Sequence, residues 1–215
     1  YIEIAGMYNE AGNYTEALKK LQLGILDTLD YKNPSFYLDL GAEERQSTSD
    51  WANAFFVKGK IELGLEDFTG CIESFGRSAY IEKEILNRID HYAVASTNEA
   101  ICALGLRKLD YAKLKFNEAI NVFAESFGVE SEQYIEANMY RALAETDLVT
   151  SVSILEEFLE KYNVCCAQHT YRKLEFNTHL GAMYSKLGDV AQAEKKFAFA
   201  KKFSEDNAYQ DNFDF

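Results

Sequence analysis

Histidine and cysteine are the side chains of this sequence that could bind a metal ion or act as nucleophiles. Cys165 and His169 are four residues apart, a spacing that places two side chains on one face of a helix. A zinc site needs three or four ligands, and Cys166 is the one further ligand nearby in the sequence. His91 and His179 fall on expected helices, at surface or groove positions. The sequence therefore predicts no metal site and no cofactor.

Motifs of known enzyme active sites are missing from the sequence. It has no Ser/His/Asp order, no glycine-rich phosphate loop and no HExxH motif. Its carboxylates are numerous, but carboxylates on surface helices are ordinarily solvated. We therefore expect that the chain is not an enzyme. A helical domain that accompanies a catalytic domain elsewhere in a longer chain is a further alternative.

The net charge limits the partners that the chain can bind. Its 22 Lys and Arg residues stand against 35 Asp and Glu residues, which gives −13 at pH 7. Such a surface repels phosphate backbones and anionic lipids, so we expect no nucleic-acid partner. We expect no membrane insertion either, because no apolar run approaches the roughly 18 residues of a membrane span. A basic peptide or protein face fits better, although acidic surfaces also serve solubility alone.

The four cysteines favour a reducing compartment. Cys71 and Cys102 fall on apolar helical faces, where a free thiol behaves as a small hydrophobic side chain. Cys165 and Cys166 are adjacent, and adjacent cysteines rarely pair with each other. Because no disulfide framework is expected, the sequence predicts a cytoplasmic location.

Small and large apolar residues recur along the chain in a fixed pattern. A first helix carries a small residue, a second helix carries another, and a large apolar residue follows four positions later. Four copies fit well: Ala5, Ala17 and Leu21; Gly59, Cys71 and Phe75; Ala100, Ala112 and Phe116; Gly181, Ala193 and Phe197. Small residues let antiparallel helices approach closely, and the large residue fills the gap to the next pair. Asn13, Asp67 and Asp189 stand between the two helices as candidate N-caps.

This pattern resembles the tetratricopeptide repeat (TPR). Matching positions are separated by about 54, 41, 39 and 42 residues, longer than the minimal 34-residue period. Repeats of 40–42 residues are similar to those of kinesin light chains and related adaptors, and the stretch Phe123–Glu130 looks like their connector. The resemblance implies an all-α fold, a TPR-like superhelix of about five antiparallel helical hairpins.

The resemblance covers residues 1–203 and divides them into five copies. These copies lie near residues 1–29, 52–83, 93–125, 133–161 and 174–203. The fourth copy is the weakest, since Met139 occupies its small-residue position. Residues 30–50 hold the only proline and are expected as an inserted loop, with a short helical piece around Phe36–Leu40. Residues 204–215 are expected as an acidic tail. Because the first residues match the interior of the repeat, we expect a part of a larger chain or complex.

The resemblance places the partner-binding groove on the first helices of the pairs. The candidate groove residues are Asn9, Asn53, Phe56, Lys60, Thr97, Asn98, Ile101, Glu136, Tyr140 and Thr178. Asparagine can bond the backbone of an extended peptide, and Phe56 and Tyr140 can anchor apolar groups. Each residue could equally be an ordinary solvent-facing helical residue. Asn98 and Lys60 fall near positions of the carboxylate clamp of chaperone-binding TPR domains, but the clamp is incomplete.

Two functions follow from the resemblance. The first is a scaffold or adaptor module within a larger protein or complex, which binds a protein or peptide through the groove or the array ends. The alternative is a regulatory receptor that binds a short signal peptide in the groove, suggested by Asn53 and Asn98. The sequence does not name the partner, because fold does not imply function.

Overall fold

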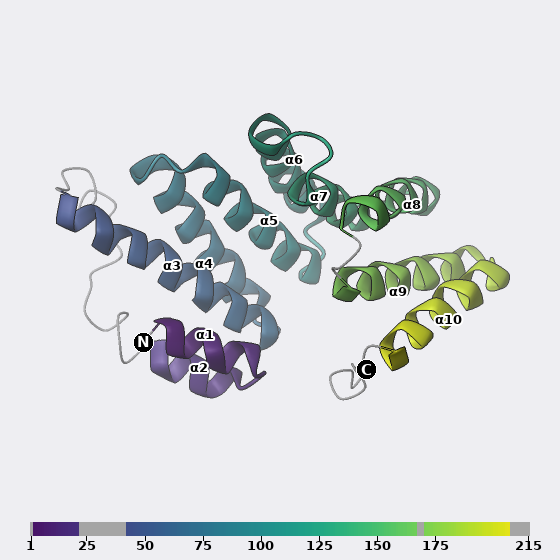
Figure 1. Ribbon diagram of the computed structural model, residues 1–215, viewed down its shortest axis with the longest axis horizontal. Helices are drawn as coiled ribbons and strands as arrows, with labels where there is room; N and C mark the ends of the chain where they lie inside the picture. Colours follow the sequence, from purple (N-terminus) through teal and green to yellow (C-terminus); the bar gives the residue numbers. More distant parts are fainter. Residues whose placement is uncertain (1, 22–41, 167–169, 207–215) are drawn as a thin grey trace. The chain divides into compact units, whose positions relative to one another are not determined.

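The computed structural model of the chain describes residues 2–21, 42–166 and 170–206, and every secondary-structure element in these residues is a helix, with short turns between the helices (Figure 1). The expectation of an all-α fold is confirmed for these residues. The elements in chain order are α1 (Ile2–Glu10), α2 (Tyr14–Leu21), α3 (Ala42–Gly64), α4 (Phe68–Tyr80), the π-helical turn η3 (Ile81–Ile85), α5 (Ile89–Gly105), α6 (Leu109–Phe127), α7 (Glu132–Leu143), α8 (Leu148–Cys165), α9 (Thr170–Leu187) and α10 (Val190–Asp206).

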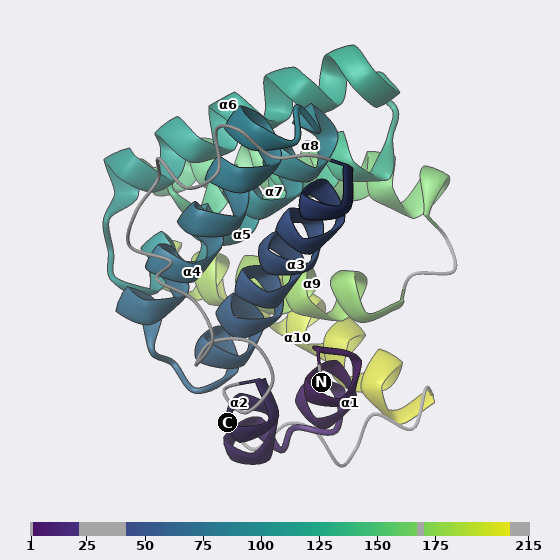
Figure 2. The same cartoon turned by 90° about the vertical axis from the view of Figure 1, so that its left-hand side faces the viewer.

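The chain divides into two compact units. The first, Tyr1–Val122, contains α1 to α5 and most of α6. The second, Phe123–Phe215, contains the end of α6 and the helices α7 to α10. Consecutive helices pair in each unit, so that α1 lies on α2, α3 on α4, α7 on α8 and α9 on α10 (Figures 1 and 2).

Small residues hold the helices of the first unit close together. Ala5 of α1 and Ala17 of α2 are fully buried and form one core cluster with residues of α3. At Gly59 of α3 a Cβ would lie 2.8 Å from the ring of Phe75 on α4, so that only glycine fits this crossing. Phe75 is fully buried and meets Phe56 edge to face, with ring centroids 5.2 Å apart. The small–large pattern of the sequence is thus the packing pattern of the helices.

The second unit packs by the same rule. The Ser151 hydroxyl of α8 donates to the Ala142 carbonyl of α7 over 2.6 Å, a buried contact that a larger residue would prevent. At Gly181 of α9 a Cβ would lie 2.7 Å from the ring of Phe197 on α10. Met139, the residue that departs from the repeat pattern, is fully buried in α7.

Asparagine and aspartate cap most of the second helices. The expected caps are confirmed: Asn13, Asp67 and Asp189 accept the N–H of the residue three positions on, Glu16, Gly70 and Gln192. Asp147 accepts the N–H of Thr150 in the same way over 3.0 Å. The corresponding position before α6 holds Lys108, whose side chain has no acceptor atom. The helix α6 therefore begins without a side-chain cap from this position.

Two helices extend beyond the sequence-based boundaries. The helix α3 begins at Ala42, so residues 42–50 of the expected inserted loop are helical instead. The rest of that loop, with the expected helical piece Phe36–Leu40, lies outside the described residues. The helix α10 ends at Asp206, so the first residues of the expected tail, 204–206, belong to it. Residues 207–215 lie outside the described part.

The cysteines are paired, contrary to expectation. Cys71 of α4 forms a disulfide with Cys102 of α5, and their Cα atoms are 6.0 Å apart. Cys165 forms a disulfide with its neighbour Cys166 at the end of α8. The prediction of free thiols treated Cys71 and Cys102 only as small packing residues. Where two helices cross closely, such residues also bring their Cβ atoms within the range that a disulfide bridges. The cysteine argument for a reducing compartment therefore fails.

No described helix is both long enough and apolar enough to cross a lipid bilayer.

Candidate functional site

The first unit contains a pocket between α3 and α5, closed at its base by the end of α4 and by η3. The helices α3, α4 and α5 can be followed in Figure 2. The pocket has a volume of about 390 Å³, within the range of ligand pockets. It is lined by Ser49, Asp50, Ala52, Asn53, Phe56, Ser78, Glu82, Arg88, His91 and Val94. Two of the predicted groove residues, Asn53 and Phe56, therefore lie at one site.

The π-helical turn η3 supplies the charged wall of this pocket. π-Helical turns are rare and are frequent at functional sites. Here the turn carries Glu82, whose side chain is only 8% exposed. Arg88 donates to both carboxylate oxygens of Glu82, from Nε over 2.6 Å and from Nη2 over 2.7 Å. The backbone N–H of Arg88 also donates to the Glu82 carbonyl over 2.7 Å. This double attachment fixes the wall before any partner binds.

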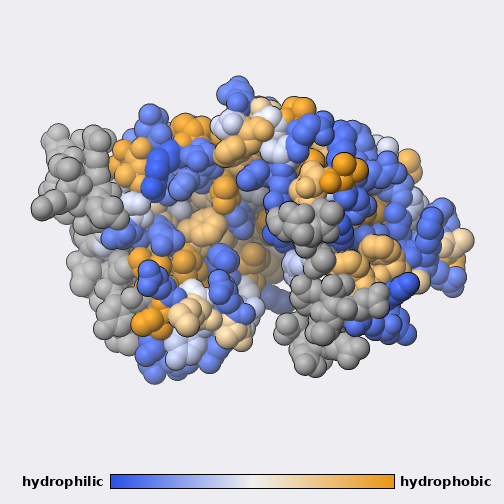
Figure 3. Space-filling view, viewed as in Figure 1, coloured by the Kyte–Doolittle hydropathy of each residue, from blue (hydrophilic) through white to orange (hydrophobic). Residues whose placement is uncertain are grey.

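The rest of the lining combines apolar groups with one free amide. Phe56 is half-buried beside Phe75, and Val94 of α5 is 38% exposed at the mouth of the pocket. Asn53 is exposed on α3, and no other described residue hydrogen-bonds to its side chain. Figure 3 shows small hydrophobic patches separated by hydrophilic residues over the first unit, on the face that it draws. Such a surface suits a partner segment with both polar and apolar groups.

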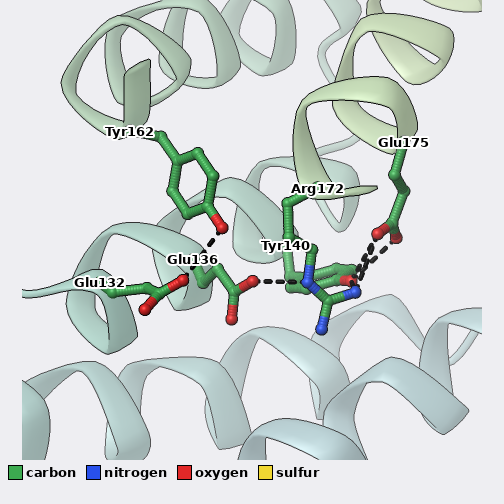
Figure 4. A network of polar contacts seen from close by, with 6 residues as sticks. All are labelled: Glu132, Glu136, Tyr140, Tyr162, Arg172 and Glu175. Carbon is green, nitrogen blue, oxygen red and sulfur yellow. Dashed lines mark hydrogen bonds and ion pairs between the residues drawn. The ribbon is translucent and has the colours of Figure 1, made fainter. Parts of the chain in front are cut away.

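The second unit holds a network of polar side chains between α7, α8 and α9, drawn in Figure 4. Arg172 of α9 lies at its centre and donates to Glu136 over 2.5 Å and to Glu175 over 2.9 Å. Arg172 also donates to the Tyr140 hydroxyl over 2.6 Å, and that hydroxyl donates to Glu175 over 2.8 Å. The guanidinium carbon of Arg172 lies 5.4 Å from the centre of the Tyr140 ring. These contacts join α7 to α9.

Burial sets the protonation of this network. It raises the pKa of Glu136 above its ordinary value, although Arg172 acts in the opposite direction. Burial and the neighbouring Glu175 raise the pKa of Tyr140, so the phenol stays neutral at all ordinary pH values. Burial alone would lower the pKa of Arg172, but Tyr140, Glu136 and Glu175 raise it overall, so the guanidinium stays charged. The network is a fixed structural joint with one arginine between two carboxylates.

The remaining predicted groove residues are not gathered at one place. Thr97 and Thr178 donate their hydroxyls to carbonyls of their own helices, Ala93 and Leu174, and the Asn98 amide donates to Val94. These three residues are thereby used within their helices. The other predicted positions are Lys60, exposed on α3, Ile101, half-buried on α5, and Asn9, half-buried on α1. The Oδ1 atom of Asn9 is buried, and no described group bonds it.

Sequence reasoning predicted Glu136 and Tyr140 of the second site, but it missed Arg172 there and the Glu82–Arg88 pair of the first site. Glu82 and Arg88 stand in the connection between repeats, where the repeat pattern has no position for a binding residue. Arg172 lies just before the fifth expected copy, on a helix that begins at Thr170. Three or more His, Cys, Asp or Glu side chains do not gather as a metal site anywhere in the described part of the chain. His169 lies outside that part.

No known family model matches the sequence, and no curated protein matches it. Solved structures do resemble the chain. It aligns with BtubC (BKLC) from P. vanneervenii at a TM-score of 0.65 and 16% identity, over 99% of this chain and 80% of that chain. Two structures of a putative kinesin light chain with nearly identical TPR-like repeats, from Podosopora anserina, align at TM-scores of 0.59 and 0.56. Both are 16% identical and cover 97% and 99% of this chain, and 94% and 95% of their own.

The chain has the fold of a TPR-like repeat protein. The resemblance read from the residue pattern is confirmed at the level of fold. Identities of 16% show a similar fold and nothing about function. The partner and the binding residues of this TPR-like chain must therefore be inferred from its own side chains.

Proposed function

We propose that this TPR-like chain is a scaffold or adaptor module that binds a protein or peptide partner, within a larger protein or complex, and that it is not an enzyme. The observation that carries the proposal is the pocket between α3 and α5. It is preformed by the Glu82–Arg88 attachment and carries the exposed, unpaired amide of Asn53. A fixed wall beside free polar and apolar groups is what a recognition surface needs, because little ordering is required on binding.

A nucleic-acid partner is disfavoured by the charge of −13, which opposes phosphate groups. The alternative of a receptor for a short signal peptide rests on the asparagines of the groove. The support for this alternative is weaker, because the Asn98 amide already donates to Val94 of its own helix. Asn53 is then the single asparagine in the lining of the pocket. We therefore favour the scaffold.

Site-specific photo-crosslinking tests the proposal. A photoreactive amino acid replaces the exposed Asn53 at the pocket, and in a matched variant it replaces the exposed Thr69 on α4. Both proteins are expressed in the native cells, irradiated and purified under denaturing conditions. We expect the Asn53 variant to trap a defined protein or peptide that the Thr69 variant does not trap. Equal products from both positions, or none from Asn53, would reject the pocket as the partner site.

A further inference from the structure

The exposed face of α10 combines two lysines with an aromatic ring. Ala193 and Ala200 of this helix are buried. Because a helix turns once in about 3.6 residues, Lys195, Phe199 and Lys202 lie together on the opposite side, and all three are exposed. No described residue forms an ion pair with either lysine. Two unpaired cations beside a ring that is 45% exposed make this face basic and apolar, in a chain whose net charge is −13.

The exposed face of α1 carries the opposite charge with the same spacing. Glu3, Met7 and Glu10 lie on the side of α1 away from the buried Ala5, and all three are exposed. No described residue forms an ion pair with either glutamate. In both helices the apolar residue follows the first charge by four positions and precedes the second by three. The two charges of each face are therefore about 10.5 Å apart along the helix axis, so one face can match the other.

Neighbouring helix pairs within the chain show how two such faces meet. The helix α4 packs on α5, and α8 packs on α9, so the second helix of one pair lies against the first helix of the next. The helix α10 is the second helix of its pair, and α1 is the first helix of its own. On this basis we propose that α10 of one copy of the chain binds α1 of a second copy. The two lysines then pair with the two glutamates, and Phe199 packs on Met7.

The charges determine which faces of two copies meet. Two α10 faces would bring lysines together, and two α1 faces would bring glutamates together. The copies repel each other at a distance because each carries −13, so association is confined to a place where opposite charges meet. The contact is heterologous, since each copy keeps a second face available for a further copy, and it produces rings or open chains. It lies outside the pocket between α3 and α5, so the proposed function does not depend on it.

Sedimentation velocity of the full chain tests the proposal. We expect the mass of the wild-type species to rise with protein concentration. Glu3→Lys with Glu10→Lys in one variant, and Lys195→Glu with Lys202→Glu in another, should each weaken association at least about tenfold, because like charges then meet. An equal mixture of the two variants should associate as the wild type does, because each α10 again meets an α1 of opposite charge.

A third variant, Lys60→Glu with Lys108→Glu, is the matched control. It makes the same charge change as the α10 variant, at exposed lysines of α3 and of the connection before α6. Its association should stay within about twofold of that of the wild type, because neither lysine belongs to the proposed contact. Far-UV circular dichroism of each variant establishes that it is folded.

Three results would overturn the proposal. The wild-type chain could stay monomeric up to millimolar concentration, the mixture of the two variants could fail to associate, or the control could lose as much association as the charge-reversed variants. A photoreactive residue in place of Phe199 separates a further occupant from the second copy. If it trapped a different protein in the native cells while the purified chain stayed monomeric, the face of α10 would belong to that protein and the proposal would be wrong.

Discussion

At the scale of single residues, Lys108 is the clearest departure from the repeat. Aspartate or asparagine caps the helices that follow Asn13, Asp67, Asp147 and Asp189, whereas Lys108 places a cation at the positive end of α6. We expect Lys108→Asp to raise the free energy of unfolding by about 1 kcal/mol, because it adds a cap and removes the repulsion. Urea unfolding measures the change. Asp189→Ala makes the opposite change, because it removes an existing cap, and it should lower the free energy of unfolding by about the same amount.

His179 gives the chain a pH dependence that can be isolated. Burial lowers its pKa, while Glu175 acts in the opposite direction. In the unfolded chain the pKa returns to about 6.5, so the unfolded state takes up a proton first as the pH falls. The contribution of His179 to stability is therefore complete above pH 6.5 and is lost as the pH falls through the lower pKa of the folded state.

We expect wild-type stability to fall faster than that of His179→Gln below pH 6.5, by up to about 1.4 kcal/mol per pH unit. Urea unfolding of both proteins between pH 5 and 7.5 measures the difference. The carboxylates titrate in both proteins, so their contribution cancels in the comparison. Parallel pH profiles would show that His179 titrates alike in the folded and unfolded states.

At the scale of elements, two glycines at equivalent helix crossings should respond differently to alanine. An added Cβ meets the ring of Phe75 at Gly59 and the ring of Phe197 at Gly181. Phe75 is fully buried and cannot move, whereas Phe197 is 41% exposed and can rotate away. We expect Gly59→Ala to destabilise the fold by about 1–3 kcal/mol. Gly181→Ala should be nearly neutral, since the helix propensity of alanine offsets the contact. Thermal unfolding of both variants checks this ranking.

Arg172 joins α7 to α9, and its loss leaves Glu136 and Glu175 without their shared cation. The arginine side chain is 34% exposed, so its loss should cost less than the loss of one partner of a fully buried ion pair. We therefore expect Arg172→Ala to lower the free energy of unfolding by about 2 kcal/mol. Adding Glu136→Gln should recover part of this loss, because burial already opposes the charge of Glu136. A double-mutant cycle from urea unfolding measures the recovery. Strict additivity of the two changes would contradict the coupling.

The repeat pattern predicted elements better than it predicted sites. Gly59, Phe75, Gly181 and Phe197 were recognisable because close helix packing needs small and large residues at fixed spacing. Thr97, Asn98 and Thr178 were predicted at the groove, but their side chains donate to carbonyls of their own helices. The spacing of a polar residue in a helix does not indicate which of these two roles its side chain takes. Glu82 and Arg88 depend on a π-helical turn, which has no signal in the repeat pattern.

At the scale of the whole molecule, the division into two units predicts how far a local defect spreads. In repeat proteins each helix pair is stabilised mainly by its neighbours, so a substitution weakens its surroundings first. Gly59→Ala acts on the α3–α4 crossing of the first unit, and Arg172→Ala acts on the α7–α9 joint of the second. The helix α6 is the one element that crosses the division at Val122 and Phe123.

Hydrogen exchange measured by mass spectrometry tests this division on the intact chain. Gly59→Ala should speed amide exchange in α3, α4 and α5 by about tenfold or more, which corresponds to at least about 1.4 kcal/mol of local stability. It should leave α9 and α10 within about twofold of the wild-type rates. Arg172→Ala should show the reverse pattern, with faster exchange in α7 and α9. If either variant sped exchange equally in every helix, the two units would unfold as one cooperative domain, because a single global opening would then expose all of their amides.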